Sequence, residues 1–296
     1  MTIARAARIL RRAAAITLVL FGVAGMGLGL WVRSEVLPGL PSDLDALRGW
    51  RPSGACRILA ADGTEIHRFY DERRFWVPID ELPDHLLRSV LVAEDRTFLE
   101  HRGVDLRGIT RAFLANARAG ETVQGGSTIT QQVVKKLIVG QDRTLRRKAR
   151  EAVLAWRLER SLSKRQILEL YLNYVALGAG NNGVEAAARD YFGRSARALD
   201  PGQSALLAGL IPAPSRYSPR HDPERAQERR ALILQTRLAL GEVDPDDVES
   251  WNRAPVLLPS PPPEPLAADY GTAVVHQLTS LFGPEALTEH GLAVHT

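Results

Sequence analysis

The chain has a single cysteine, Cys56, among its 296 residues, so no disulfide bond can form within it. It also lacks a strong excess of charge of either sign, because 38 Lys and Arg residues face 34 Asp and Glu residues, for a formal net charge of +4. So small a charge is compatible with phosphates or anionic lipid head groups as partners, and it argues against nucleic acid. No internal repeat is present, and the length suffices for a sizeable core in one domain, with or without appendages.

One long uncharged run stands out near the N-terminus, from Ala13 to Val32. A run of this length, at a rise of about 1.5 Å per residue, covers roughly 30 Å, the thickness of the hydrocarbon core of a bilayer. Trp31 suits the head-group level at the end of the run. Arginines precede it, at Arg5, Arg8, Arg11 and Arg12. The run therefore predicts a single-pass anchor in the inner (cytoplasmic) membrane, with the N-terminus in the cytoplasm and the rest of the chain outside it.

A cleavable signal peptide is the alternative interpretation of this run. The small residues Gly25, Gly27 and Gly29 fit a signal peptide, but no Ala-x-Ala cleavage site follows them. We therefore favour an anchor that stays in the protein.

The remaining chain changes character several times. Ile58 to Phe69 predicts a β-hairpin, since Asp62-Gly63 stands between two apolar stretches. From Leu82 to about Leu240 the apolar spacing is helical almost throughout, which predicts a mostly α fold. The expected segments are a basic cytoplasmic tail (1–12), the transmembrane anchor (13–32), a juxtamembrane connector with the hairpin (33–71), the main helical domain (72–240), a Pro-rich linker (241–265) and a final linker segment (266–296).

Capping sequences indicate where two of the helices begin. Ser163 with Gln166, and Asp200 with Gln203, form capping boxes ahead of apolar helical stretches. Pro201 suits the first helical position of the second of these helices.

The first candidate for a chemical role is Glu94, which directly follows the apolar run Val90–Ala93. If the helix continues, Glu94, Phe98 and His101 share one face at i, i+4 and i+7. A carboxylate at the edge of a core tends to have a raised pKa and can act as a general base. The alternative is an amphipathic helix with solvated acids, which this stretch alone favours. A metal site is disfavoured, because no third ligand stands at a recognisable spacing.

A second stretch, from Gln124 to Leu137, joins a pair of glycines to a helix. Ser127 is a good N-cap for this helix, and Gly140 can end it. A glycine loop at a helix start, with Lys135 two turns along, suits an anion such as a phosphate, although many loops share this pattern.

A third stretch, from Arg143 to Glu151, places five cations within nine residues and ends in a carboxylate. Arg147 and Lys148 precede Glu151 by four and three positions, so they can pair with it on one helical face. The plain alternative is a solvated helix with intrahelical ion pairs. The functional alternative is a cationic wall for a pyrophosphate, with Glu151 held ionised beside it.

Together these stretches resemble the successive motifs of one family. The motifs are Glu-Asp-x-x-Phe-x-x-His-x-Gly at 94–103, Gly-Gly-Ser-Thr-Ile-Thr-Gln-Gln at 125–132, Arg-Lys-x-x-Glu at 147–151, Ile-Leu-Glu-Leu-Tyr-Leu-Asn at 167–173 and Ala-Leu-Leu-Ala-Gly-Leu-Ile-Pro at 205–212. Over about 72–234 the chain resembles the family 51 glycosyltransferases, which occur in class A penicillin-binding proteins and as monofunctional peptidoglycan glycosyltransferases.

The resemblance implies a mostly α, lysozyme-like fold of two lobes, the smaller one close to the membrane. It implies that lipid II is polymerised into β-1,4-linked glycan strands, with inversion at the anomeric carbon and release of undecaprenyl pyrophosphate, in cell wall biosynthesis. The expected partners are lipid II, the growing glycan chain, the cytoplasmic membrane and other cell-wall synthesis proteins. Some family members respond to divalent cations, so Mg²⁺ or Mn²⁺ stays open as a cofactor, although we see no dedicated metal site.

The resemblance also implies roles for individual residues. Glu94 matches the catalytic base and Glu151 the second essential acid. Residues 112–124 would form a mobile flap between the lobes. The supporting groups that match are Asp95, Phe98 and His101 around the base; Arg111, Ser127, Thr128, Gln131 and Gln132 at positions that contact sugar or phosphate; and Lys135, Arg143, Lys148 and Arg150 near the pyrophosphate.

The sequence departs from the family in a few places. Where the family commonly has three aromatic residues and a glutamate, this chain has Ala176, Leu177, Asn182 and Gln203. These differences bear on packing at the acceptor side and leave the matched acids unchanged.

The segment 270–296 resembles the linker that leads towards a transpeptidase domain in bifunctional members. The chain contains no pair of Ser-x-x-Lys and Lys-Thr-Gly sequences. We therefore expect no transpeptidase active site within these residues.

Two rival functions remain at this point. A lytic transglycosylase or lysozyme-like hydrolase would share the fold and a catalytic glutamate, but it would not need the pyrophosphate-binding cations around 143–151. A non-catalytic membrane scaffold would have no physical need for Glu94 and Glu151.

Overall fold

The structure, a computed structural model, describes residues 3–48, 56–69, 73–120, 125–140, 142, 144–256, 258–259, 268–283 and 293–295. Within these residues the chain is mostly helical, as the sequence predicts. The α-helices are α1 (Ile3–Trp31), α2 (Asp84–Glu94), α3 (Leu106–Ala119), α4 (Ile129–Val134), α5 (Leu145–Ser161), α6 (Lys164–Tyr174), α7 (Val184–Phe192), α8 (Pro201–Leu210), α9 (Pro223–Ala239), α10 (Pro245–Arg253) and α11 (Ala268–Phe282). Shorter π or 3₁₀ turns cover Val32–Val36, Asp45–Arg48, Ile79–Glu81, Lys135–Val139 and Ala196–Ala198.

Two small sheets complete the described fold. The strands are β1 (Cys56–Leu59), β2 (Glu65–Phe69), β3 (Arg73–Arg74), β4 (Asn181–Asn182) and β5 (Ala293–His295). β1 and β2 form the predicted antiparallel hairpin, and Ala60 donates to the Thr64 carbonyl at 2.8 Å across its turn. β5 lies parallel to β1 on the other side, so the last described residues return to the hairpin, while β3 and β4 pair separately.

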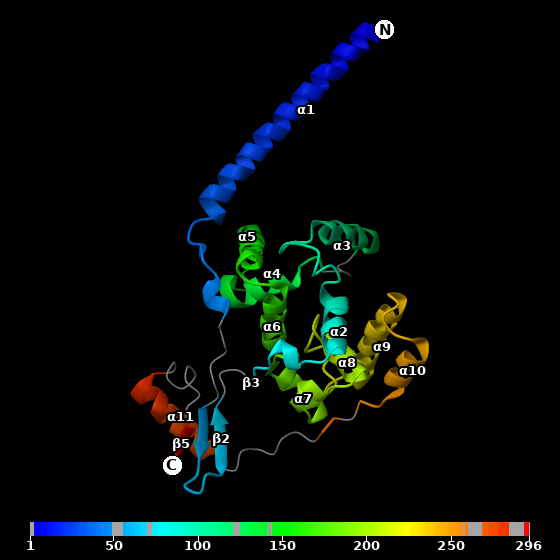
Figure 1. The fold of residues 1–296 in the computed structure, drawn as a ribbon. Helices are drawn as coiled ribbons and strands as arrows, with labels where there is room; N and C mark the ends of the chain where they lie inside the picture. Colours follow the sequence, from blue (N-terminus) through cyan, green and yellow to red (C-terminus); the bar gives the residue numbers. More distant parts are fainter. Residues whose placement is uncertain are drawn as a thin grey trace.

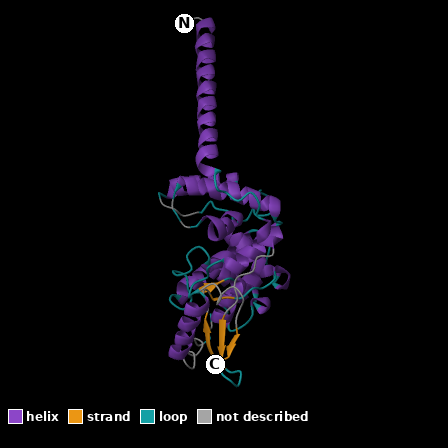
Figure 2. Cartoon of the chain, turned by 90° about the vertical axis from the view of Figure 1, so that its left-hand side faces the viewer, coloured by secondary structure: helices purple, strands orange, loops and turns teal. Residues whose placement is uncertain are grey.

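α1 leaves the rest of the molecule as one extended rod (Figures 1 and 2). The stretch Ala14–Val36 is long and apolar enough to cross a membrane, and none of its apolar window is buried inside the protein. Apolar side chains without protein partners need another apolar environment, which supports the anchor predicted over 13–32. A signal peptide passes the same test of length and composition, so that alternative is still open.

The two ends of the helical body differ. α3 and α5 lie at the end from which α1 leaves, whereas β1, β2, β5 and α11 lie at the opposite end (Figures 1 and 2). Between α1 and β1 the chain therefore passes from one end of the helical body to the other.

Three arginines of α5 bind this connector. The side chains of Arg146, Arg150 and Arg157 donate hydrogen bonds to backbone carbonyls at positions 35, 36, 38 and 41. Charged donors form strong hydrogen bonds with carbonyl oxygens. The exit of α1 is thus fixed against one face of α5.

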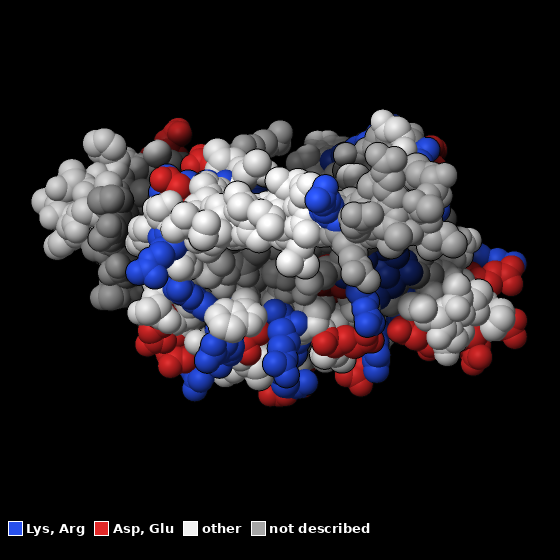
Figure 3. Space-filling model, turned by 90° about the horizontal axis from the view of Figure 1, so that it is seen from above, with Lys and Arg blue, Asp and Glu red and all other residues white. Residues whose placement is uncertain are grey.

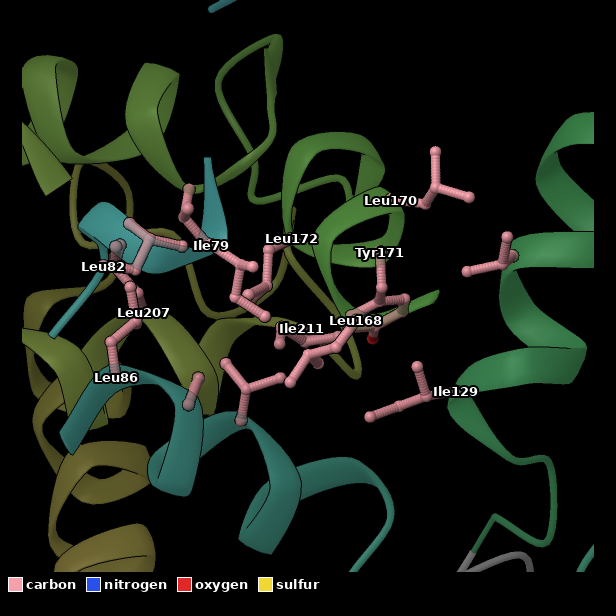
Figure 4. Close-up of a cluster of buried hydrophobic side chains, with 14 of the residues drawn as sticks. Ile79, Leu82, Leu86, Ile129, Leu168, Leu170, Tyr171, Leu172, Leu207 and Ile211 are labelled. Carbon is pink, nitrogen blue, oxygen red and sulfur yellow. The ribbon is translucent and has the colours of Figure 1, made fainter. Parts of the chain in front are cut away.

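α8 is the central helix of the core. Eight of its ten residues are buried, as expected for a helix that neighbours surround on all sides. Figure 4 shows Leu207 of α8 beside Leu82 and Leu86, while Ile129 of α4 and Tyr171 of α6 lie at the other side of the same cluster. The core therefore joins the helices that carry the predicted motifs.

The predicted helix starts are confirmed at two places and corrected at a third. The capping boxes ahead of α6 and α8 are both present. For α4, however, Thr128 is the N-cap and the prediction of Ser127 is wrong by one residue. Thr128 is favoured because its hydroxyl also donates to the Gly103 carbonyl at 2.6 Å, a contact between distant parts of the chain.

Gly103 shows why the first motif ends in glycine. Its φ is +87°, and a Cβ at this position would lie 2.6 Å from the backbone carbonyl carbon and oxygen of Ala155 in α5. A positive φ is costly for residues with a side chain, and the backbone of a packed helix cannot move aside cheaply.

We therefore expect Gly103→Ala to lower the free energy of unfolding by about 2 to 5 kcal/mol, from backbone strain and steric overlap together. Urea unfolding followed by circular dichroism measures the loss. Gly125→Ala is the matched control, because nothing lies within 4 Å of its Cβ position and its φ is not positive. Equal stability of the two variants would contradict the prediction.

Candidate active site

Glu94 is the last residue of α2, and its side chain is only partly exposed. Its Oε2 accepts a 2.7 Å hydrogen bond from Nε2 of Gln132 in α4. Oε1 of Gln132 in turn accepts a 3.3 Å bond from the hydroxyl of Tyr171 in α6. Three helices therefore meet at this carboxylate.

The surroundings of Glu94 change its proton affinity. Burial raises the pKa of Glu94 above its usual value, and hydrogen bonds from Gln132 and Tyr171, with the positive charge of Arg229, partly offset this effect. Burial, reinforced by the nearby Glu94, also raises the pKa of Tyr171, so the tyrosine stays a neutral donor. The shift at Glu94 has the direction that its place after an apolar run predicts, and it suits a general base.

The chain leaves the helix directly after Glu94. Asp95 is the C-cap of α2, with φ −159°, and the following residues form turns. The prediction that Glu94, Phe98 and His101 share a helical face is therefore wrong. The helix ends because the buried Asp95 turns its carboxylate to α4, where Oδ2 accepts a 3.0 Å bond from the N–H of Ile129.

The turns nevertheless bring Phe98 and His101 to Asp95. Nε2 of His101 lies 2.9 Å from Oδ2 of Asp95. The fully buried ring of Phe98 meets the His101 ring edge-on, with centroids 6.1 Å apart. The three side chains form one buried unit next to Glu94 in the sequence.

The four polar residues predicted for the site at the start of α4 fall into two groups. Thr128 and Gln131 are buried and satisfy each other in a capping box, so their side chains serve the helix start. Ser127 is exposed and accepts a 3.0 Å bond from Nζ of Lys148, while Gln132 holds the acid at the end of α2. Only the second group stands next to charged groups of the candidate site.

Glu151 is buried in α5 with a cation on each carboxylate oxygen. Arg147 donates to Oε2 at 3.1 Å, and Nζ of Lys148 contacts Oε1. Both predicted ion pairs are confirmed. Burying an ionised carboxylate costs much free energy unless a cation pairs with it. Two cations against one acid leave a net positive charge, which suits an anionic ligand.

The start of α4 connects the two acids. Ser127 bonds Lys148, which is a partner of Glu151. A few residues later Gln132 bonds Glu94. Glu94 and Glu151 therefore flank the same short segment, although they come from different helices.

The other predicted cations have different places. Lys135 is exposed at the end of α4, and Arg111 is exposed on α3. Arg150 binds connector carbonyls, so the structure does not bring it to the two acids. It lies two positions from Lys148, which places it on another side of the helix. Arg143 lies outside the described residues.

The structure describes only part of the predicted flap, and it shows no ligand set for the predicted divalent cation. Residues 112–119 belong to the second half of α3, and 121–124 lie outside the described residues. Among the residues that the structure describes, no group of three or more His, Cys, Asp or Glu side chains is arranged to hold a metal ion. The structure therefore assigns no ligands to a divalent cation.

Three residues of the fourth motif have contacts that the sequence did not predict. In the sequence Tyr171 belongs to the apolar side of a helix. A buried tyrosine usually has a hydrogen-bond partner for its hydroxyl, and this rule could have predicted the contact with Gln132. Glu169 accepts a 3.0 Å bond from the N–H of Ile79. Asn173 exchanges hydrogen bonds of 2.8 and 2.9 Å with the backbone of Val77. The last two attach the segment before α2 to α6.

Comparison with known proteins identifies the family of this chain. Residues 62–237, more than half of the chain, match the family model described as Transglycosylase. The chain belongs to the transglycosylase family. The matched range contains both acids and all five motifs, so the resemblance to family 51 glycosyltransferases is confirmed.

Individual relatives of this family match over most of the chain. The chain is 41% identical over 243 residues to penicillin-binding protein 1A of Aquifex aeolicus (strain VF5), which covers 80% of this chain and 33% of that protein. It is 42% identical over 226 residues to penicillin-binding protein 1A of Neisseria flavescens, covering 76% and 28%. The chain thus spans about a third or less of the length of these relatives.

A solved structure supports the same fold. The crystal structure of penicillin-binding protein 1A from Haemophilus influenzae matches with a TM-score of 0.53 and 24% identity. The match covers 83% of this chain and 27% of that chain. It supports the mostly α fold expected for the transglycosylase family.

We expect Tyr171→Phe to raise the pKa of Glu94 further. The tyrosine hydroxyl stabilises the ionised carboxylate by a hydrogen bond, and the substitution removes this hydroxyl. Infrared titration of the protonated carboxyl band, with the spectrum of Glu94→Gln subtracted, measures the midpoint. Tyr270→Phe is the control, since this exposed tyrosine lies in α11 at the other end of the molecule. An unchanged or lowered midpoint in Tyr171→Phe would contradict the assignment.

Proposed function

We propose that this protein is a peptidoglycan glycosyltransferase that polymerises lipid II into β-1,4-linked glycan strands and releases undecaprenyl pyrophosphate. One observation carries the proposal: the buried carboxylate of Glu94 and the cluster of Arg147, Lys148 and Glu151 flank the start of α4. The reaction requires a proton acceptor and a cationic group, and both bond residues of this one segment. Membership of the transglycosylase family supports the same reaction.

In this reaction Glu94 is the general base. It takes the proton of the acceptor's 4-hydroxyl while that oxygen attacks the anomeric carbon of the donor. The bond from this carbon to the pyrophosphate oxygen breaks in the same displacement, which converts an α-linked donor into a β-linked product. Burial supports the role, because the raised pKa of Glu94 strengthens it as a proton acceptor.

The cation cluster would stabilise the departing pyrophosphate. Lys148 bridges Ser127 and Glu151, and Arg147 holds the other oxygen of Glu151. Fixed positive groups stabilise negative charge that develops on a leaving group. In this proposal Glu151 holds the two cations in place, and the exposed Lys135 adds a further charge at the end of α4.

α1 and α3 support a place at the inner membrane, with a cytoplasmic N-terminus and the helical body outside. α3 exposes Leu106 (73%) and Phe113 (70%), and α5 exposes Leu145. These helices lie at the end from which α1 leaves (Figure 1). Seen from that end, the uncharged part of α1 crosses in front of the helical body, and Lys and Arg side chains lie beside it (Figure 3). Apolar groups next to cations suit an anionic bilayer surface, where the lipid tail of the donor would be held.

We expect Glu94→Gln to lower polymerisation by about 10²- to 10⁴-fold, the contribution typical of a general base, without unfolding the protein. Purified protein is incubated with labelled lipid II, with and without Mg²⁺ or Mn²⁺, and the glycan length is measured. Glu100→Gln is the matched control, because this acid is exposed a few residues further along the same segment. Circular dichroism checks the fold of both variants.

Three outcomes would count against the proposal. Shortening of preformed glycan, without new polymer from lipid II, would favour a lysozyme-like hydrolase. No reaction of the wild-type protein under any of these conditions would favour a scaffold. A wild-type rate in Glu94→Gln would rule out this residue as the base.

We expect Lys135→Ala to lower the rate at low lipid II concentration by about tenfold, which corresponds to roughly 1.4 kcal/mol, because a charged contact to the diphosphate is lost. The thermal midpoint should hardly change, since the side chain is exposed. Arg194→Ala, which removes an exposed cation just after α7, serves as the control. Equal rates of Lys135→Ala and wild type at low donor concentration would refute this role.

A further inference from the structure

A second cluster of ionisable side chains lies next to Asp95. Nε2 of His101 is 2.9 Å from Oδ2 of Asp95, and Nδ1 is 3.8 Å from Oε1 of Glu159 in α5. The three side chains are only 4 to 7% exposed. Within the described part of the chain, Nδ1 has no hydrogen-bond partner. The proposed reaction uses none of these groups directly.

The ring of His101 therefore faces a carboxylate at each nitrogen. If Nε2 alone carries a proton, the lone pair of Nδ1 points at Glu159. If Nδ1 alone carries the proton, the lone pair of Nε2 faces Oδ2 of Asp95 at 2.9 Å. Both neutral forms place a lone pair against a negative charge where little water can screen it. Only the imidazolium form presents a proton to both carboxylates.

Glu159 is also tied to two other helices. Its Oε1 accepts a 2.6 Å bond from the hydroxyl of Thr130 in α4 and a 2.7 Å bond from Nζ of Lys164 in α6. The same Nζ lies 4.4 Å from the centre of the Phe98 ring. Two carboxylates and one ammonium leave one negative charge unbalanced, and a protonated His101 balances it.

We propose that Glu159 is a positioning residue for the base: it holds His101 as an imidazolium between two carboxylates. This ionic bridge fixes Asp95 and the start of α4 relative to Glu94. The inference rests on the proposed function and deepens it. Glu159 acts through His101 and Asp95.

The bridge reaches the base by two short routes. Asp95 follows Glu94 in the chain and accepts from the N–H of Ile129, the first residue of α4. Gln132, one turn later in α4, donates to the carboxylate of Glu94. A shift of Asp95 therefore moves both the backbone of the base and the amide that holds it. A misplacement of about 1 Å can lower a rate by roughly a hundredfold.

Ionisable groups of several neighbouring elements face His101. They are Asp95 after α2, Asp105 before α3, Glu159 in α5 and, through Glu159, Lys164 at the start of α6. α4 contributes the neutral hydroxyl of Thr130 to the cluster. The three carboxylates outnumber Lys164 and Arg111, whose charge acts on Asp105, and this balance favours a charged ring at His101.

The protonation state of His101 can be measured directly. The full chain, labelled with ¹⁵N-histidine, is studied in detergent micelles by NMR, and His101→Gln assigns the signals of this residue among the seven histidines. Near neutral pH we expect protons on both ring nitrogens in the wild type and on one in Glu159→Gln. This measurement needs no lipid II, so it stays readable if the proposed polymerisation fails.

The effect on the base is measured by kinetics. We expect Glu159→Gln to lower kcat by about ten- to a hundredfold while KM for lipid II changes less than about twofold. Glu159→Asp, which keeps a carboxylate beside the His101 ring, should restore part of kcat. Glu224→Gln, an exposed acid in the first turn of α9, is the control.

Several results would overturn the inference. A wild-type His101 with one ring proton near neutral pH would exclude the bridge. An unchanged kcat in Glu159→Gln, or a raised KM with unchanged kcat, would exclude a positioning role. If Glu159→Gln does not fold, Thr130→Val replaces it in the kinetic test, because this change removes one donor to Glu159. The NMR signals of the wild-type His101 ring still show whether both nitrogens carry protons. If the wild-type protein does not polymerise lipid II but its His101 carries two ring protons, the proposed function is refuted and the ionic bridge is not.

Discussion

The start of α4 is the constraint on which the candidate site depends. The first N–H groups of a helix lack partners within it, and they carry partial positive charge. Asp95 accepts from one of them, at Ile129, and this bond ends α2 directly after Glu94. Gln132 of the same helix then holds the carboxylate of Glu94. A requirement of the backbone of α4 thus decides where the acid at the end of α2 stands.

The two acids occupy contrasting environments. Glu94 has neutral partners, Gln132 and the hydroxyl of Tyr171, and its burial raises its pKa. Glu151 has a cation on each oxygen. A group that must accept a proton benefits from the first environment, because desolvation strengthens it as a base. A group that must hold cations near a diphosphate benefits from the second. The proposed division of roles follows from these surroundings and does not require different residue types.

Features that depend on residues a few positions apart could be predicted from the sequence. The hairpin, the capping boxes of α6 and α8 and the ion pairs within α5 all belong to this class. The corner at Asp95 could not be predicted, because helical spacing continues past it and the bond to Ile129 joins distant positions. The choice of Thr128 over Ser127 has the same cause, since a contact with the Gly103 carbonyl decides it.

α5 shows why a count of cations cannot assign their roles. Arg147 and Lys148 face Glu151. Three arginines of the same helix bind the connector that follows α1, namely Arg146, Arg150 and Arg157. Successive residues of a helix point about 100° apart, so neighbours in the sequence can serve different sides of the helix. One rigid helix thus carries the cation cluster on one side and binds the connector after α1 on another. If α1 spans the membrane as proposed, the connector contacts of α5 set the height of the cluster above the bilayer, where the diphosphate of a lipid-linked donor would lie.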